Sequence, residues 1–210
     1  MCRRKSRSTK EIALLFRRFV PAILITFIVA SIVSAEETSL PAEQFAARVP
    51  PEWKGVYQYR RPGIMLAEFL PPAEQVTDWS TMLSYEFHAI DVWMDPIEFA
   101  EDFAANQAEL CEGFQSLTMS SGLENGFPTS VRMLICPKMM ASGKGRVTML
   151  KAVHGNRGYY VAALMRRADQ FDPEETPVVP DEISAWSQFM RKIVVCVPGD
   201  AEHPCPASDT

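Results

Sequence analysis

The 210-residue chain lacks the short motifs that mark common catalytic and metal sites. Its three histidines, His88, His154 and His203, are far apart in the sequence, whereas a zinc site usually has at least one close pair of ligands. There is no C-x-x-C and no G-x-S-x-G, and the Gly-Lys-Gly at residues 143–145 lacks the Ser or Thr that completes a phosphate-binding loop. We therefore expect no metal site and no cofactor.

Positive charge is also scarce, with 21 Lys and Arg against 26 Asp and Glu and a net charge of −5. General nucleic-acid binding needs a basic face, so this balance argues against it. The chain is 47% hydrophobic and 22% charged, which is ordinary for a packed globular protein of one domain or two small ones.

The basic residues that are present gather at the N-terminus. The first 18 residues carry seven of them against one acid, Glu11, and an uncharged stretch follows at residues 19–33. With small residues at Val33 and Ala35, this is the pattern of a secretory signal peptide. We predict a signal peptide at residues 1–35, cleaved near Ala35, and a periplasmic or secreted mature protein. The alternative is an uncleaved anchor, which would be the chain's only membrane contact, but fifteen helical residues span about 22 Å of a ~30 Å core.

Without residues 1–35 the chain has 14 basic and 25 acidic residues, a net charge of −11, and four cysteines. An even number of cysteines in an exported protein predicts disulfides, and four cysteines allow three connectivities. We favour pairing of sequence neighbours, Cys111 with Cys136 and Cys196 with Cys205. Metal binding or thiol catalysis is the alternative, and its only support is the nearby His203. Four alkylatable thiols in the native protein would contradict the disulfides.

Hydrophobic patterning predicts an α+β fold. Strands are expected at residues 64–70, 82–90, 116–121, 129–136, 146–153, 159–167 and 193–196, and helices at 95–111 and 181–192. The order is therefore β-β-α-β-β-β-β-α-β. Hairpin turns at Asn125-Gly126 and at residues 155–158 favour an antiparallel sheet of five to seven strands, flanked by two main helices.

Two local patterns carry further detail. Asp95, Pro96 and Glu98 form a helix start, with a capping residue, a proline at the first helical position and a capping-box acid. In the strand at 82–90, apolar residues alternate with a second set that includes Ser84, Glu86 and His88, which is typical of a half-buried strand. For the domain organisation we expect a lead-in segment at 36–55, one α+β domain at 56–196 and a disulfide-tethered polar tail at 197–210.

One region concentrates the positive charge that remains after residue 35. Six basic residues and two tyrosines lie within 24 residues, and a basic aromatic surface in an acidic protein is a candidate site for an anionic ligand or an acidic partner. The alternative is an exposed sheet face whose charges pair with neighbouring acids. The residues of this candidate surface are Lys144, Arg146, Lys151, Arg157, Tyr159, Tyr160, Arg166 and Arg167.

Several segments resemble exported proteobacterial proteins of unknown function, over roughly residues 57–205. They are residues 67–79, 124–126, 135–137, 143–145, 147–155 and 160–161. The layout is similar to that of PsbP-like domains, in which helices flank an antiparallel sheet. The resemblance implies a binding or assembly role and no catalytic residues.

We therefore expect an exported, non-enzymatic binding or assembly module whose partner is a protein or an anionic ligand of the cell envelope. The alternative is an envelope hydrolase with a discontinuous active site, since a triad need not be close in sequence. It would use His88 or His154 as its base, which requires an imidazole within about 3.2 Å of a Ser, a Cys or a carboxylate.

Overall fold

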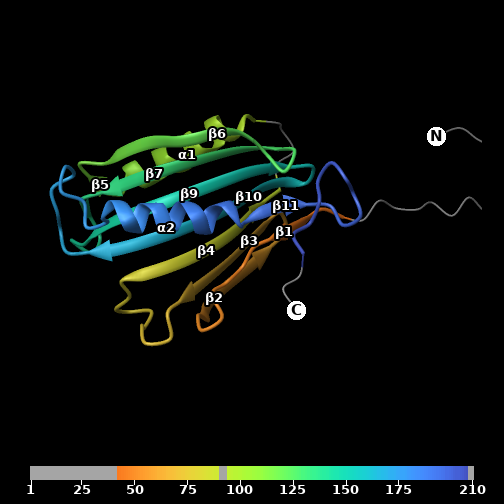
Figure 1. Cartoon of the computed structure of the whole chain (residues 1–210). Coiled ribbons are helices and arrows are strands. Elements are labelled where there is room, and N and C mark those ends of the chain that lie inside the picture. Colours follow the sequence, from red (N-terminus) through yellow and green to blue (C-terminus); the bar gives the residue numbers. More distant parts are fainter. Residues whose placement is uncertain (1–41, 90–93, 208–210) are drawn as a thin grey trace, which may run out of the picture. The chain divides into compact units, whose positions relative to one another are not determined.

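A seven-stranded antiparallel sheet forms the centre of the fold (Figure 1). The computed structural model describes residues 42–89 and 94–207, which belong to one compact unit. Across the sheet the order is β2-β3-β4-β10-β9-β7-β6, and every neighbouring pair is antiparallel. The strands are β2 (Lys54–Arg61), β3 (Ile64–Leu70), β4 (Thr81–His88), β10 (Gly158–Ala168), β9 (Gly145–Gly155), β7 (Phe127–Cys136) and β6 (Gln115–Glu124).

Two helices cover opposite faces of this sheet. Helix α2 (Pro180–Arg191) packs through Trp186 and Met190 on one face, and α1 (Pro96–Ala108) packs through Phe99 and Ala104 on the other. In Figure 1, α2 lies in front of the sheet and α1 behind it. Because side chains alternate along a strand, each central strand supplies both cores. Neither helix in the described residues is long and apolar enough to span a membrane.

Two short ladders complete the fold. Strand β1 (Gln44–Ala46) pairs with β11 (Val194–Cys196), and β5 (Cys111–Glu112) pairs with β8 (Lys138–Met139). Each ladder lies next to a disulfide, because the bonds Cys111–Cys136 and Cys196–Cys205 are both formed. The predicted cysteine pairing is therefore confirmed.

The predicted fold class, an α+β fold with an antiparallel sheet and two flanking helices, is confirmed. The hairpin at Asn125-Gly126 forms as expected, with positive φ at both residues (51° and 80°). Asp95 caps α1 by accepting the Ile97 amide at 2.8 Å, and Pro96 is the first helical residue. The predicted signal peptide at 1–35 lies outside the described residues.

The structure also corrects the prediction. The expected strand order lacked β1, β2, β5 and β8, and α1 ends at Ala108 rather than near 111. The short strands β5 and β8 are too brief to give a periodic signal, and Cys111 leaves the helix to pair with Met139. Residues 36–55, expected to be a lead-in segment, contain β1 and the start of β2.

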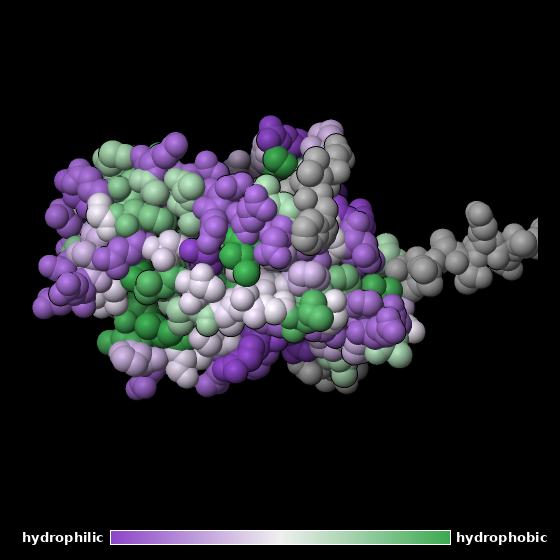
Figure 2. Space-filling view, turned by 90° about the horizontal axis from the view of Figure 1, so that it is seen from above, coloured by the Kyte–Doolittle hydropathy of each residue, from purple (hydrophilic) through white to green (hydrophobic). Residues whose placement is uncertain are grey.

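The two edges of the sheet differ in charge. Edge strand β2 carries Lys54, Arg60 and Arg61, and charges on an edge oppose pairing with another chain. Edge strand β6 has no charged residue before Glu124, and its Leu117 and Leu123 are exposed. Figure 2 looks down on the side where β6 lies in Figure 1, and shows hydrophobic residues exposed among hydrophilic ones. The β6 side is thus the less protected edge.

Candidate functional site

The eight residues of the predicted basic surface do not form one surface. Alternation along β9 and β10 divides the strand residues between the two faces of the sheet. Lys151, Tyr160 and Arg166 lie on the α2 face, and Arg146, Tyr159 and Arg167 lie on the α1 face. Lys144 and Arg157 lie in turns at opposite ends of the β9–β10 pair. The prediction of a shared surface is therefore wrong, because neighbours in sequence on a strand point in opposite directions.

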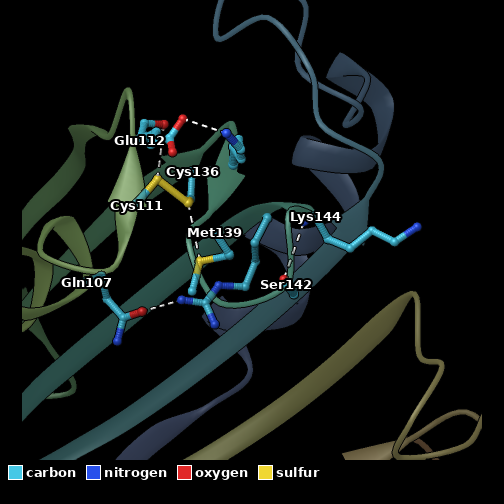
Figure 3. Close-up of a disulfide and its surroundings, with 9 residues drawn as sticks. Gln107, Cys111, Glu112, Cys136, Met139, Ser142 and Lys144 are labelled. Atoms are coloured by element: carbon cyan, nitrogen blue, oxygen red, sulfur yellow. Dashed lines mark hydrogen bonds and ion pairs between the residues drawn. A yellow bond between two sulfur atoms is a disulfide. The ribbon is translucent and has the colours of Figure 1, made fainter.

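Four of these basic residues form ion pairs with acids of the chain. Lys144 bonds Asp169 at 2.6 Å in a largely exposed pair, and Figure 3 shows its side chain extending away from the nearby disulfide. The others are Lys151 with Glu124, Arg166 with Glu182, and Arg167 with Asp78. This is the arrangement that the alternative interpretation described, in which the charges pair with neighbouring acids.

Lys151 is a buried structural cation, with 1% of its surface exposed. Its ammonium donates to the Glu124 carboxylate and to the carbonyls of Met190 and Ile193, at 3.0 and 2.8 Å. Met190 lies in the last turn of α2 and Ile193 lies two residues beyond its end, where a cation also interacts favourably with the helix dipole. Burial lowers the pKa of Lys151, and the Glu124 hydrogen bond and charge oppose that shift. Lys151 therefore joins the end of α2 to the sheet through hydrogen bonds, and its buried ammonium group is not available to bind a ligand or another protein.

Tyr160 and the turn that carries Arg157 are held by Glu43, a buried acid that sequence reasoning missed. Its carboxylate accepts the amides of Asn156 and Arg157 at 2.6 and 2.7 Å and the Tyr160 hydroxyl at 3.0 Å. Burial, followed by the Glu43 charge, raises the pKa of Tyr160. Glu43 precedes β1, so the lead-in residues stabilise the β9–β10 hairpin. No local pattern marks this contact, which joins residues more than a hundred positions apart.

Arg146 differs from these paired cations. Its guanidinium donates to the side-chain oxygen of Gln107 on α1, and within the part of the chain that the structure describes it has no carboxylate partner. Burial lowers the pKa of Arg146, which reflects the cost of removing this charge from water. Figure 3 shows Gln107 in the surroundings of the Cys111–Cys136 disulfide.

Arg146 lines a cavity of about 160 Å³ between α1 and the sheet, which we name the α1 cavity. Its apolar walls include Phe103, Phe114, Leu134 and Met165. Six polar residues also face it, from both helix and sheet: Glu68, Ser84, Glu86, Gln107, Arg146 and Thr148. An apolar cavity with a few convergent polar groups is the usual form of a small-molecule site.

Ser84 is the least satisfied of these polar groups. Only 3% of its surface is exposed, and its hydroxyl oxygen is one of two buried side-chain oxygens in the described residues with no hydrogen-bond partner. Glu68 lies directly opposite Ser84 in the β3–β4 register, and Glu86 lies two residues further along β4 on the same face. Burial, followed by the charge of Glu86, raises the pKa of Glu68. The α1 cavity therefore contains polar groups for which the described residues supply no partner.

Sequence reasoning assigned these residues to the wrong environment. The alternation of Ser84, Glu86 and His88 against apolar residues was correctly interpreted as two faces of a strand. The polar face, however, is covered by α1, because Phe99 stacks on the Tyr159 ring at 4.0 Å and Arg132 reaches Glu101 at 3.2 Å. The alternation showed only that Ser84, Glu86 and His88 share a face of β4. The one further sign of a site in the sequence was that this face holds two ionisable residues and a serine.

The histidines were the candidate bases of a hydrolase. His88 Nε2 lies 2.8 Å from Glu86 Oε2, which meets the distance condition for an imidazole oriented by a carboxylate. His154 packs on the Tyr159 ring at 4.7 Å, and burial lowers its pKa. A nucleophile must also contact the base. Ser84, on the same face as His88, has no hydrogen-bond partner among the residues that the structure describes, so Ser84, His88 and Glu86 do not form a triad there.

The residues that the structure describes contain no candidate metal site. They contain no group of three or more His, Cys, Asp or Glu side chains placed to hold an ion. His203 lies 3.2 Å from Asp200 and packs against Phe127 at 4.5 Å, near the Cys196–Cys205 disulfide. The four cysteines outside the predicted signal segment are all oxidised to disulfides.

Comparison with known proteins does not identify the chain. No family model and no curated protein matches it. Among solved structures it is similar to the crystal structure of LpqN, described as involved in cell envelope biogenesis of Mycobacterium tuberculosis. The match has 18% sequence identity, covers 77% of this chain and 88% of that one, and has a TM-score of 0.41. Similarity at this level establishes neither a family nor a function.

Proposed function

We propose that this chain is exported and serves as a non-enzymatic binding module of the cell envelope, with the α1 cavity as its binding site. Export is supported by the basic and apolar pattern of residues 1–35 and by two disulfides, which persist in oxidising compartments. The resemblance to exported proteobacterial proteins and to PsbP-like domains supports a binding role over an enzymatic one.

The observation that carries the proposal is the Ser84 hydroxyl, which is buried in the α1 cavity with no hydrogen-bond partner in the described part of the chain. A buried polar group left unpaired costs about 1–3 kcal/mol, and such groups concentrate at sites with a functional reason to keep them. A bound molecule that pairs with Ser84 recovers this free energy. A purely structural role for the cavity would favour Ala or Val at position 84.

A ligand screen on the exported protein, purified from the periplasm, tests the proposal. We expect some small polar compounds to raise the melting temperature of the wild type, and to have no effect on Ala163→Leu, which fills the cavity. Ala162→Leu is the matched control, because Ala162 is the neighbouring buried residue on the α2 face. If no compound distinguishes Ala163→Leu from the control, the α1 cavity is not a binding site.

Two further measurements address export and catalysis. Intact mass of the periplasmic protein should correspond to cleavage near Ala35, and a retained N-terminus would support the anchor instead. The purified protein should not turn over ester, phosphate, peptide or glycan substrates. Turnover that is lost in His88→Asn would overturn the non-enzymatic role and establish the hydrolase.

A further inference from the structure

The α1 cavity contains an acidic and a basic side chain, Glu68 and Arg146, neither of which forms an ion pair within the described residues. Glu68 has no hydrogen bond or ion pair within the described residues, and burial, followed by repulsion from the charge of Glu86, raises its pKa. Arg146 bonds only the neutral Gln107 in the same part of the chain. A charge removed from water is costly unless it is paired, so both groups favour a ligand that compensates them.

The sheet register places these two charges at opposite ends of the cavity. Glu68 lies in the cross-strand row of Ser84, Ala163 and Leu150, and Arg146 lies four residues from Leu150 along β9. With three strand spacings of about 4.8 Å between β3 and β9 and about 3.3 Å per residue, the two α-carbons are roughly 20 Å apart. The side chains cannot close this gap, so Glu68 and Arg146 do not neutralise each other.

The space between them is small and largely apolar. At about 160 Å³ the α1 cavity is smaller than the ~300 Å³ lower range of drug-sized sites, so its occupant is a small molecule and not a polymer. Phe103, Leu134 and Met165 line it together with the polar groups. A fitting ligand therefore has a short apolar body and charged ends.

We propose that the α1 cavity binds a small zwitterion, with its ammonium group against Glu68, Glu86 and Ser84 and its carboxylate against Arg146. This inference rests on the proposed function of the cavity. An ammonium group relieves the repulsion between the two glutamates and donates to the unpartnered Ser84 oxygen. The planar guanidinium of Arg146 matches a carboxylate, and such charge-assisted pairs are stronger than its present bond to a neutral amide.

Ligands with a single charge fit less well. An amine would leave Arg146 without an anion, and a carboxylic acid would leave Glu68 without a cation and place its own charge in a site with two glutamates. A zwitterion compensates both ends at once and adds no net charge. The two charged ends of the cavity therefore favour a zwitterion over a simple amine or a simple carboxylic acid.

Titration calorimetry on the wild-type exported protein tests this with defined probes. We expect one of the ω-amino acids γ-aminobutyrate, δ-aminovalerate and ε-aminocaproate to bind at least about tenfold more tightly than pentylamine or valerate, a difference of about 1.4 kcal/mol. The best chain length then measures the distance between the two charged ends. Because this comparison uses only wild-type protein, it does not depend on the folding of any variant.

Two variants assign the ends of the ligand. Glu68→Gln should weaken binding of the amino acid and of pentylamine but not of valerate, and Arg146→Met should weaken the amino acid and valerate but not pentylamine. Arg166→Met is the matched control, because Arg166 pairs with Glu182 on the α2 face, and it should change none of these affinities.

Two outcomes would overturn the inference and leave the proposed function intact, and a third would overturn both. If pentylamine or valerate binds as tightly as the best amino acid, or no ω-amino acid binds while a screened compound does, the ligand is not a zwitterion although the cavity is a site. If nothing binds and Ala163→Leu behaves as its control, the proposed function itself fails and the inference falls with it.

Discussion

Two cations on β9, Lys151 and Arg146, differ in how many of their hydrogen bonds the protein supplies, and they lie on opposite faces of the sheet. Lys151 faces α2, where Glu124 and two carbonyls use all three of its protons. Arg146 faces α1, where within the described residues it bonds only a glutamine amide and opens onto a cavity. Removing one partner of a buried charge that the chain satisfies completely is strongly destabilising, because the other partner is left unpaired. A partly buried charge that is incompletely satisfied beside a cavity is the feature that we propose as a ligand site. The predictions below test this contrast, from the largest expected effect to the smallest.

Removing Lys151 should have the largest effect on stability. Lys151→Ala leaves Glu124 without its cation and the end of α2 without its donor, so we expect a loss of about 3–5 kcal/mol in the free energy of unfolding. Urea denaturation measures this. Arg166→Ala, which breaks a more exposed ion pair, is the control and should cost no more than about 1 kcal/mol. Equal losses in the two variants would remove the distinction between a buried and a partly exposed ion pair on the α2 face.

The two disulfides provide a second test of the contrast. They join residues 25 and 9 positions apart, so chain entropy predicts stabilisation of about 3.5 kcal/mol for Cys111–Cys136 and about 2.7 kcal/mol for Cys196–Cys205. Only the first adjoins the α1 cavity, since Cys136 lines it. Replacing each pair by serines should destabilise both proteins and weaken ligand binding only in the Cys111/Cys136 variant. Equal weakening of binding by both replacements would contradict a local role.

The buried carboxylate of Glu43 accepts hydrogen bonds from neutral donors, two backbone amides and a tyrosine hydroxyl. Glu43→Gln keeps its size but replaces one acceptor by a donor that faces the Asn156 and Arg157 amides. Since hydrogen bonds to a charged group contribute about 1.5–3 kcal/mol, we expect a loss of about 1–2 kcal/mol in urea denaturation. Glu52→Gln, at an exposed position, is the control. A neutral result for Glu43→Gln would show that the β9–β10 turn does not need this contact.

Glu68 should give the smallest effect, and one of opposite sign. Because burial raises its pKa, the folded state favours the protonated carboxyl, and this contribution is lost as the pH rises above 4.5 through the raised pKa. At neutral pH, Glu68→Gln should therefore stabilise the protein, by roughly a few tenths of a kcal/mol because a half-buried carboxylate is screened by solvent.

The pH dependence of unfolding separates this effect from a general one. The stability of the wild type should contain a component that falls as the pH rises past 4.5, and that component should be absent in Glu68→Gln. If the variant is less stable than the wild type at neutral pH, Glu68 has a structural partner, and the α1 cavity is satisfied in the same way as the α2 face.

Local signals predicted the elements of this fold because their causes are local. Asn125-Gly126 forms its turn because both residues adopt positive φ, and Asp95 with Pro96 begins α1 because the cap and the fixed φ act within one turn. The cysteine pairing followed from an even count and neighbouring positions. The short strand β1 was missed because it exists only through pairing with β11, about 150 residues away, although the strand at 193–196 itself was predicted.

The candidate site was predicted poorly for the same reason. Six basic residues close in sequence suggested a surface. Alternation along β9 and β10 divides four of them between the two faces, the other two lie in turns, and four of the six form ion pairs with acids. The residues that do line a cavity, such as Glu68, Ser84 and Gln107, come from β3, β4 and α1 and share no sequence pattern. Only their meeting in space makes them a candidate site.

The sequence by itself determined seven of the eleven strands in the described residues, the start of α1, the hairpins β6–β7 and β9–β10 and the alternation of faces along each predicted strand. Backbone preferences and period-two alternation act over a few residues, so these features have local causes. Only the tertiary structure decided what covers each face. The alternation of polar and apolar residues along β4 would be the same whichever element covered either face of the strand. The long-range packing of α1 encloses Ser84 and Glu86 in a cavity, while the packing of α2 buries Lys151 among its partners.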